Sequence, residues 1–448
     1  MTLKPYFEIL KLVWPLALGM INNALMQFVD RAFLAQDSMA SLEAVLPASL
    51  LCWIFASFFQ SVVGYAGVFV AQYHGAGEDE RCHDSYRAAV WIALAAGALM
   101  LPIVPLGNWI LALTAPSAAV VALERTYFDI VTVGSVCIYG QMAAASYFTG
   151  RGATRIVFWV NLLGNVLNAA LDPFLIFGWC GCPKLGIAGA AYATVFSMLV
   201  QWAVLALAVR RQGVALASSD SGELRALVRR ILRFGIPSGG YSVLNILSFT
   251  VFVFVTGKVG DLAFAVSNAC FTVNYLLFAP MEGFALGVQT LVGQARGRSD
   301  NAAAFLALRR TMLLGLGFVS VCCLFVIVFY RPILAVFAPP EISAHGEFLS
   351  LGLCLLCLMA AWMLFDAADV ILSGALKGAG DTKFVMWWIL FNSFVLWLPQ
   401  VFVVRAFHNT MPALWATMIL YVVVLCIGST VRWRRGRWRR IDMTGRDA

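Results

Sequence analysis

Long apolar runs recur along the chain, separated by short polar segments. The runs are about 20 to 30 residues long and lack the strict alternation of hydrophobic and polar positions that marks a strand. Inside a bilayer an α-helix satisfies all of its own backbone polar groups, so each run predicts a membrane-spanning helix. The twelve predicted spans are 9–33, 44–73, 86–113, 124–149, 156–178, 186–209, 232–257, 263–293, 306–335, 347–375, 383–406 and 412–431.

The composition agrees with this pattern. Hydrophobic residues make up 61% of the 448 residues and charged residues make up 12%, whereas a soluble globular chain carries about 25% charged residues. A soluble fold of this length could not bury so much apolar surface. We therefore expect an all-α polytopic membrane protein. The first apolar run lacks a small-residue cleavage site, so we interpret it as a span rather than a signal peptide.

Basic residues predict how the helices are oriented. An even number of spans places both ends of the chain on one side, and twenty-five of the 31 Lys and Arg residues fall on that side. By the positive-inside rule, both termini and the central linker are expected to be cytoplasmic, in the inner membrane. The net charge of +8 is thereby explained without nucleic-acid binding. The basic tail from Arg432 to Arg440 includes Trp433 and Trp438, and it is predicted to anchor at lipid headgroups.

The sequence contains an internal repeat. Three pairs of identical residues are each separated by 222 positions, and they are Pro15 with Pro237, Asn23 with Asn245, and Gln72 with Gln294. Each copy holds six spans, so both copies have the same orientation in the membrane. We predict twelve transmembrane helices in two six-helix bundles, related by a pseudo-twofold axis along the membrane normal, which suits alternating access. The predicted domains are the bundle 1–209, the linker 210–231, the bundle 232–431 and the tail 432–448.

Polar residues inside the spans are costly, so each one needs a structural or functional reason. In the fifth span, polar side chains recur at steps of four, three and four residues and share one helix face; they are Asn161, Asn165, Asn168 and Asp172. A carboxylate beside amide oxygens offers hard ligands to a cation, and it can also hold a proton. The alternatives are hydrogen bonds between helices and, for Asp172, a role in a kink at Pro173.

Further candidates lie in both halves of the chain. Asp30 in the first span and Thr194 in the sixth have a depth similar to that of Asn168 and Asp172, although an ion pair between Asp30 and Arg31 would also explain Asp30. The C-terminal half has four candidates for binding substrate or an ion: Asn245, Glu282, Asp366 and Asp369. The last two share a helix face, so they cannot both ionise cheaply. Alternatively, one of them pairs with a neighbouring span and is inert.

Several short patterns, in order along the chain, resemble those of the multidrug and toxic compound extrusion (MATE) transporters. They are Pro15 through Phe28-Val29-Asp30-Arg31 in the first span, Asn168 to Pro173 in the fifth, Gly186 to Thr194 in the sixth, Leu291 to Gln294 in the eighth, and Phe365-Asp366 with Gly374 to Gly378 in the tenth. The resemblance covers nearly the whole chain. It implies a secondary antiporter that exports small organic cations in exchange for H⁺ or Na⁺ by alternating access, with no other cofactor.

The resemblance also implies roles for individual residues. In such transporters an Asp of the first span, an Asn and an Asp of the fifth and a Thr of the sixth form the ion site. Here these are Asp30, Asn168, Asp172 and Thr194, and Na⁺ is the one metal ion expected there. Some members also use an Asp of the tenth span, here Asp366, with a Glu of the seventh, where this chain has Asn245. We therefore expect the ion site in the N-terminal half, in a monomer whose partners are organic cations and membrane lipid.

Other interpretations fit the sequence less well. A lipid-linked saccharide flippase of the same broader superfamily would carry cationic residues in its cavity, whereas the charges inside the spans here are mainly acidic. A drug–proton antiporter of the major facilitator type would carry a G-x-x-x-D-R-x-G-R-R pattern after its second span, which the segment from His74 to Arg81 does not match. The four His residues are scattered, so an enzyme is not expected. Cys180 and Cys182 alone are a weak indication of a metal site.

Overall fold

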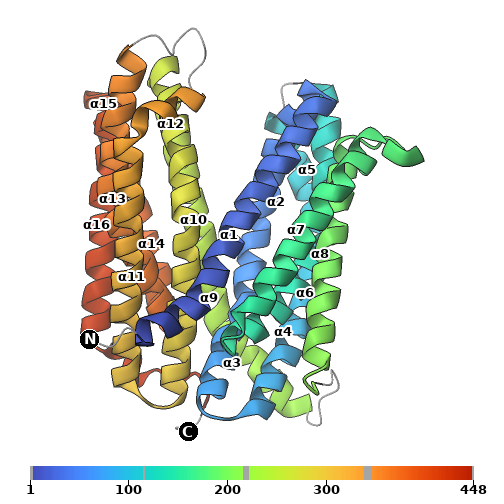
Figure 1. Ribbon diagram of the computed structural model, residues 1–448, viewed down its shortest axis with the longest axis vertical. Helices are drawn as coiled ribbons and strands as arrows, with labels where there is room; N and C mark the ends of the chain where they lie inside the picture. Colours follow the sequence, from blue (N-terminus) through green and yellow to red (C-terminus); the bar gives the residue numbers. More distant parts are fainter. Residues whose placement is uncertain (1–3, 115–116, 215–220, 338–345, 446–448) are drawn as a thin grey trace. The chain divides into compact units, whose positions relative to one another are not determined.

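The fold is α-helical in the part of the chain that the structure describes. The computed structural model describes residues 4–114, 117–214, 221–337 and 346–445, and these residues form helices and no strand (Figure 1). Eleven of the described helices are long and apolar enough to cross a membrane, or twelve if the bent pair Asp79–Met100 and Ile103–Leu113 counts as one span. The predicted all-α polytopic membrane fold is confirmed.

The helices of the N-terminal half follow the predicted spans. They are α1 (Lys4–Asp37), α2 (Met39–Gly64), α3 (Ala66–Gly75), α4 (Asp79–Met100), α5 (Ile103–Thr114), α6 (Ala118–Gly150), α7 (Thr154–Phe177) and α8 (Ile187–Arg210), with the short turn η1 at Trp179–Gly181. Ser38 and Ser117 cap α2 and α6, because each side chain accepts a hydrogen bond from a backbone N–H of the first turn. Gly178 ends α7 with a φ of 79°, a left-handed conformation that favours glycine.

The helices of the C-terminal half also follow the predicted spans. They are α9 (Ser221–Thr256), α10 (Asp261–Gly297), α11 (Asn301–Val328), α12 (Tyr330–Phe337), α13 (Gly346–Gly378), α14 (Thr382–Leu390), the π-helix η2 (Phe391–Trp397), α15 (Leu398–Phe407), α16 (Met411–Arg434) and the turn η3 (Arg437–Arg440). The last part of the predicted linker, from Ser221 onward, therefore belongs to a helix.

Two of the predicted spans are sharply bent or end early. The third consists of α4 and α5, which meet at an angle of 46°. Pro102 lies at this break, and a proline cannot donate the next helical hydrogen bond. The ninth, predicted as 306–335, ends at Val328, and α12 follows as a separate short helix that contains Pro332. Apolar character predicts where a span lies, whereas the break depends on the local loss of backbone hydrogen bonds.

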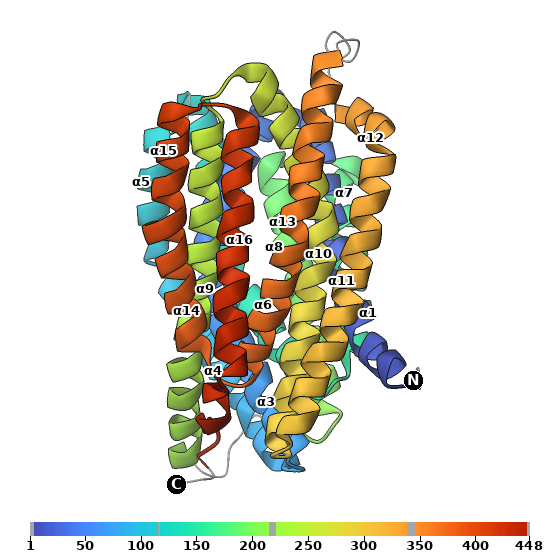
Figure 2. The ribbon, with the colours of Figure 1, turned by 90° about the vertical axis from the view of Figure 1, so that its left-hand side faces the viewer.

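Two compact units make up the fold. Unit 1 combines α1 up to Ala17 with Leu244–Val292 and Asp300–Asp442, and unit 2 combines Leu18–Val243 and Gly293–Ser299 with the tail from Met443. In unit 2, α6 packs against α2, α4 and α8. In unit 1, α13 lies between α11 and α16 (Figure 2). The core of unit 1 contains the stacked rings of Phe271 and Trp415, whose centroids are 4.7 Å apart.

A reciprocal contact inside unit 2 follows the internal repeat. Gly75 ends α3 and Gly297 ends α10, and these glycines are separated by the same 222 positions as Gln72 and Gln294. A Cβ atom on Gly75 would collide with the backbone carbonyl of Gln294, and one on Gly297 would collide with that of Gln72. Each copy's glycine thus lies against the other copy's glutamine, as in a twofold-related pair. Only glycine permits so close an approach.

Candidate functional site

The predicted polar face of α7 connects this helix to its neighbours in unit 2. Gln141 of α6 donates a hydrogen bond to Asn161 Oδ1 at 2.9 Å. One turn further along α7, Asn165 donates to Asn23 Oδ1 of α1 at 3.1 Å. These two asparagines therefore form interhelical hydrogen bonds, which satisfy amide groups that would otherwise be costly in a membrane.

Asn168 brings Asp30 and Thr194 together. Its side chain is buried. With the amide oriented to satisfy both neighbours, its nitrogen donates to Asp30 Oδ1 at 3.3 Å and its oxygen accepts from the backbone N–H of Thr194 at 3.3 Å. The Thr194 hydroxyl donates to the backbone carbonyl of Ala190 at 2.9 Å. Thr194 thus reaches Asn168 through its backbone, while its hydroxyl oxygen can still accept a hydrogen bond or ligate a cation.

Asp172 is buried and faces Asp30. Its exposed fraction is 0%, and neither of its carboxylate oxygens has a hydrogen-bond partner within the described part of the chain. The carboxyl groups of Asp30 and Asp172 lie within hydrogen-bonding reach of each other if one of them holds a proton. Tyr127 of α6 lies close enough to both carboxyl groups to be influenced by their charge. We call Asp30, Asn168, Asp172 and Thr194 the N-half site.

The N-half site is chemically suited to hold a proton or a small cation. Two facing carboxylates repel each other, and burial removes much of the water that would screen them. A proton shared by Asp30 and Asp172 would remove one of the two charges. Na⁺ would find carboxylate and amide oxygens, which are the ligands that hard cations prefer. Because Pro173 has no N–H, the carbonyl of Ala169 also lacks its usual helical partner.

Three of the four C-terminal candidates lie on α10 and α13 of unit 1, and α16 packs against them. Asp369 is buried and accepts a hydrogen bond from Ser429 Oγ at 2.6 Å. Asp366 lies one turn away on α13, close enough to Asp369 and Glu282 for their charges to repel. Lys377, also on α13, lies close enough to Glu282 and Asp369 to attract both. We call Glu282, Asp366, Asp369, Lys377 and Ser429 the C-half cluster.

Sequence patterns alone missed Lys377 and Ser429 of the C-half cluster, and Tyr127 beside the N-half site. The predicted tenth span ends at 375 and places Lys377 in a loop, but α13 continues to Gly378. The Cα–Cβ bonds of a helix tilt toward its N-terminus, so Lys377 leads back toward Asp369. Tyr127 is one of 12 Tyr residues and carries no distinguishing pattern. Asn245, which was predicted as a candidate, has an exposed side chain on α9.

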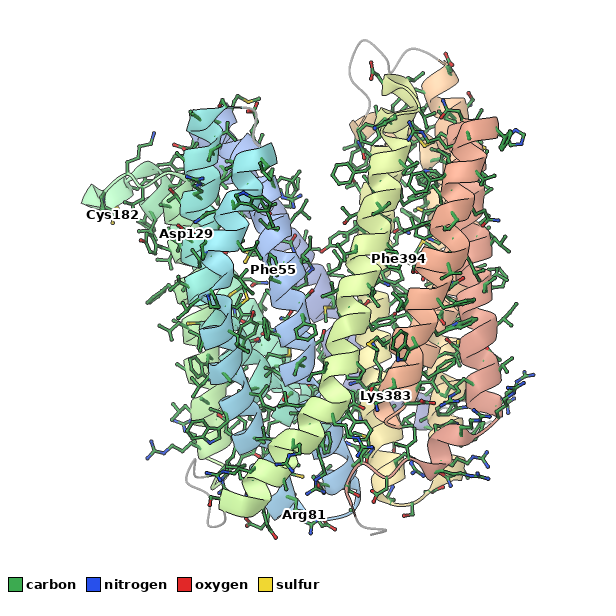
Figure 3. All side chains as sticks on the ribbon, turned by 180° about the vertical axis from the view of Figure 1, so that it is seen from behind. Phe55, Arg81, Asp129, Cys182, Lys383 and Phe394 are labelled. Carbon is green, nitrogen blue, oxygen red and sulfur yellow. The ribbon has the colours of Figure 1, made fainter. Side chains whose placement is uncertain are left out.

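The loop after α7 carries the two cysteines of the C-x-C pattern. Figure 3 shows Cys182 at the far end of this loop, away from the helices of its unit. Cys180 and Cys182 are both free thiols. Among the residues that the structure describes, no group of three or more His, Cys, Asp or Glu side chains could hold a metal ion. Two thiols alone supply half of the ligands that a structural zinc site uses.

Known proteins resemble this chain over most of its length. It is 23% identical over 436 residues to the probable multidrug resistance protein NorM of Thermotoga maritima, covering 97% of this chain and 93% of that protein. It is 27% identical over 387 residues to the protein of the same name from Pseudomonas aeruginosa, covering 84% of this chain and 78% of that protein.

Solved structures share the fold. A crystal structure of a MATE protein in the straight conformation has a TM-score of 0.86 and 19% identity, covering 98% of this chain and 97% of that one. A transporter of the MOP superfamily from Pyrococcus furiosus has a TM-score of 0.83 and 19% identity, with the same coverage. For that transporter, a reverse polarity of the binding pocket is said to suggest a different function.

The family model described as MatE matches the chain twice, at residues 15–174 and 237–403. The two matches begin at Pro15 and Pro237, the same 222 positions apart as the repeat in the sequence. Together they cover more than half of the chain. The chain therefore belongs to the MatE family of multidrug and toxic compound extrusion proteins, and it is a transporter rather than an enzyme.

Proposed function

We propose that this transporter exports small organic cations in exchange for H⁺ or Na⁺, and that the N-half site binds the coupling ion. The names of the NorM relatives support drug export. The observation that carries the ion site is the facing pair of Asp30 and Asp172, together with the absence of any hydrogen-bond partner for Asp172 among the described residues. A proton or Na⁺ would supply what this pair lacks.

We also propose the predicted topology. Both termini and the linker 210–231 are cytoplasmic, and the bundles 1–209 and 232–431 move against each other as a monomer in the inner membrane. The distribution of twenty-five of the 31 Lys and Arg residues supports this orientation. The reciprocal glycine contacts of the two repeats support the pseudo-twofold relation.

In the proposed cycle, ion binding and substrate binding exclude each other. Uptake of the ion from outside neutralises the Asp30–Asp172 pair and weakens the attraction for a cationic substrate. Helix α1, which carries Asp30 and contains Pro15, then adjusts its bend. The substrate leaves, the loaded carrier turns inward, and release of the ion restores the acidic pair. Each ligand shifts the equilibrium by its different affinity for the two states.

Ethidium efflux from proteoliposomes tests this proposal. Wild type, Asp30→Asn and a control, Asp261→Asn, are compared under a pH gradient alone and under a Na⁺ gradient alone. Asp261 begins α10 and has an exposed side chain, so its substitution removes the same charge outside the N-half site. We expect one gradient to drive efflux in wild type and control, and efflux to be lost in Asp30→Asn.

The opposite outcomes are equally informative. Efflux that persists in Asp30→Asn would contradict the N-half assignment and direct attention to Asp366, Asp369 and Glu282. Wild-type protein that responds to neither gradient would contradict cation antiport, and a lipid-linked saccharide flippase would become the next function to test.

A further inference from the structure

The basic tail after α16 folds into a defined structure. The rings of Trp433 and Trp438 stack with centroids 4.3 Å apart, and Trp438 Nε1 donates to the backbone carbonyl of Trp433 at 3.0 Å. Phe305 of α11 packs against both indoles. Gly436, with a φ of 69°, makes the turn between α16 and η3. This buried aromatic core packs the turn, from which the arginine side chains extend, against α11.

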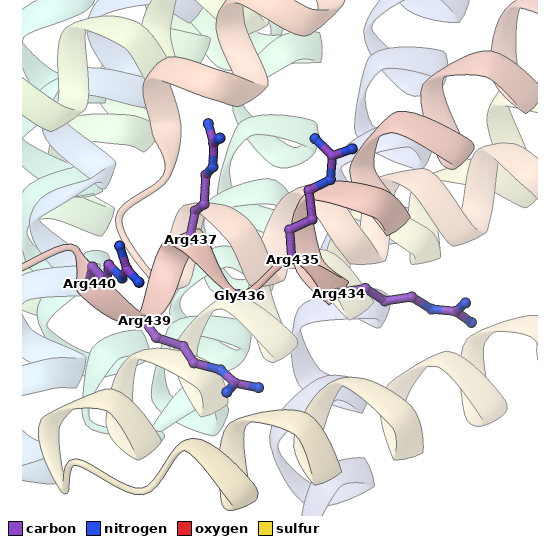
Figure 4. Close-up of a pocket in the computed structure, with 6 residues that line it drawn as sticks. All are labelled: Arg434, Arg435, Gly436, Arg437, Arg439 and Arg440. Carbon is purple, nitrogen blue, oxygen red and sulfur yellow. The ribbon is translucent and has the colours of Figure 1, made fainter.

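These arginines surround one hollow. It has a volume of about 410 Å³ and is lined by Arg434, Arg435, Gly436, Arg437, Arg439 and Arg440 (Figure 4). We call it the arginine hollow. The side chains of Arg434, Arg435, Arg437 and Arg440 are exposed. None of these four forms an ion pair or a side-chain hydrogen bond within the described residues.

Asp381, a buried carboxylate at this end of unit 1, is already paired. Arg432 donates to Asp381 through Nε at 2.6 Å and through a terminal nitrogen at 3.0 Å. Its guanidinium also lies 4.8 Å from the centre of the Phe384 ring. Asp442 follows in the chain but does not line the arginine hollow. The arginine hollow has no acid in its lining. Arg435 and Arg437 extend to the same side of the turn in Figure 4, and an anion with several oxygens bound between them would relieve the repulsion of their guanidinium groups.

A second, mostly apolar hollow adjoins the first. It has a volume of about 460 Å³ and is lined by Phe384, Trp388, Gly428, Val431, Arg432, Arg435 and Arg437. We call it the apolar hollow, and it shares Arg435 and Arg437 with the arginine hollow. Its apolar walls come from α14 and α16, which belong to membrane-spanning segments. Gly428 allows the Trp388 indole to lie directly against α16, where Nε1 donates to the backbone carbonyl of Leu425 at 3.1 Å.

The surroundings of the apolar hollow indicate that it faces lipid. On α16, Ile427 is 58% exposed and Val431 is 41% exposed, and on α14 Trp387 is 61% exposed. Large apolar side chains on the outside of a spanning helix are in contact with acyl chains. Figure 3 shows Lys383, near the start of α14, toward the end of unit 1 from which the basic tail leaves. Phe394, in η2 directly after α14, lies further from that end. The apolar hollow thus leads from the charged end of unit 1 along its spanning helices.

We propose that the two hollows together bind one anionic phospholipid, with its phosphate in the arginine hollow and an acyl chain in the apolar hollow. Arginine binds phosphate oxygens through paired N–H donors. The shared residues Arg435 and Arg437 lie where the phosphate and the glycerol of one molecule would meet. This is a defined binding site, which goes beyond the diffuse attraction of a basic tail to a charged membrane surface.

Lipid binding to the purified full-length protein, measured by native mass spectrometry, tests the proposal. Phosphatidylglycerol is titrated against phosphatidylcholine with the same acyl chains. The double variant Arg435→Gln/Arg437→Gln is compared with Arg298→Gln/Arg309→Gln, which removes the same charge from exposed positions outside both hollows. We expect phosphatidylglycerol to bind preferentially, with a loss of at least tenfold in affinity in the first variant and less than twofold in the second.

A second pair of variants tests the apolar hollow. Val431→Gln places an amide in its lining, whereas Ile427→Gln makes the same kind of change one turn away on α16, outside the lining. We expect a severalfold loss of phosphatidylglycerol binding in Val431→Gln and little change in Ile427→Gln. Equal losses within either pair of variants would overturn the proposal, because binding would then depend on total charge or hydrophobicity. Displacement of the lipid by millimolar inorganic phosphate would also overturn it, because the hollow would then bind phosphate rather than lipid.

Discussion

The acidic groups of the two halves of the chain are neutralised differently. In the C-half cluster, Asp369 accepts a hydrogen bond from Ser429, and Lys377 attracts Asp369 and Glu282. In the N-half site, Asp172 has no hydrogen-bond partner among the described residues, and the group that faces it is a second carboxyl, Asp30. Arg31 follows Asp30, but its side chain is exposed. The cation beside the C-half cluster, Lys377, attracts two of its acids, whereas Arg31, whose charge reaches Asp30 in the N-half site, has an exposed side chain.

This difference indicates separate roles for the two groups. A cluster that contains its own lysine can remain ionised without a ligand, at the cost of depending on that lysine. A facing pair of carboxyls instead requires a proton or a cation from outside, which is the property that an ion-coupled transporter uses. We therefore expect substitutions in the N-half site to affect transport most, and those in the C-half cluster to affect stability most.

The largest expected effect concerns transport. Asp172→Asn removes the carboxylate that lacks a hydrogen-bond partner among the described residues. Ion-driven efflux in proteoliposomes should therefore fall about a hundredfold, and each factor of ten corresponds to about 1.4 kcal/mol of activation free energy. Asp369→Asn should lose much less, because Asp369 is already satisfied by Ser429 and by Lys377. Initial efflux rates at matched protein density measure both. If Asp369→Asn lost as much efflux as Asp172→Asn, the two halves would not have separate roles.

The next effect concerns stability. Lys377→Met leaves the carboxylates of the C-half cluster without their cation, and breaking a buried ion cluster costs about 3 kcal/mol. The melting temperature in detergent should fall clearly, whereas Lys383→Met, at an exposed position at the start of α14, should leave it nearly unchanged. An unchanged melting temperature in Lys377→Met would show that the lysine does not stabilise the cluster.

The smallest effect tests a packing feature that both halves of the chain share, a glycine that lies against the backbone of a neighbouring helix. In α13 a Cβ atom on Gly374 would lie 2.6 Å from the carbonyl oxygen of Ala285, and in α6 one on Gly150 would lie 2.5 Å from that of Gly67. Gly→Ala at either position should destabilise the protein by about 2 kcal/mol through overpacking. Gly317→Ala is the control, because nothing lies within 4 Å of its added Cβ, and it should stabilise α11 by about 0.5 kcal/mol. Melting temperatures that fell in Gly317→Ala as well would contradict this packing account.

Most of the fold could be predicted from the chain's hydrophobic pattern. All twelve predicted spans correspond to helices, because runs of this length and composition cannot be stable in water or as open strands in lipid. The breaks at Pro102 and after Val328 were not predicted, since both lie inside continuous apolar runs. The division into bundles 1–209 and 232–431 and the roles of the site residues stay predictions.

Periodicity alone placed the polar face of α7. The steps between Asn161, Asn165 and Asn168 put them on one side, and the structure shows them contacting α6, α1 and α8. Which helix each one would meet depended on packing between segments far apart in the sequence. Lys377 shows the same limit, because its partner Glu282 lies on another helix almost a hundred residues earlier.

The sequence by itself determined that this protein lies in a lipid bilayer and that its spans are helices, because both depend on the local free energy of burying side chains and backbone in lipid. It also determined the approximate number of spans and, through the repeated residues, their duplication. Only the tertiary structure decided which acids face each other and which have a lysine. It also decided that the arginines after α16 enclose a hollow beside the apolar side chains of α14. Charges and hydrogen bonds act over a few ångströms in space, and sequence distance says little about which groups come that close.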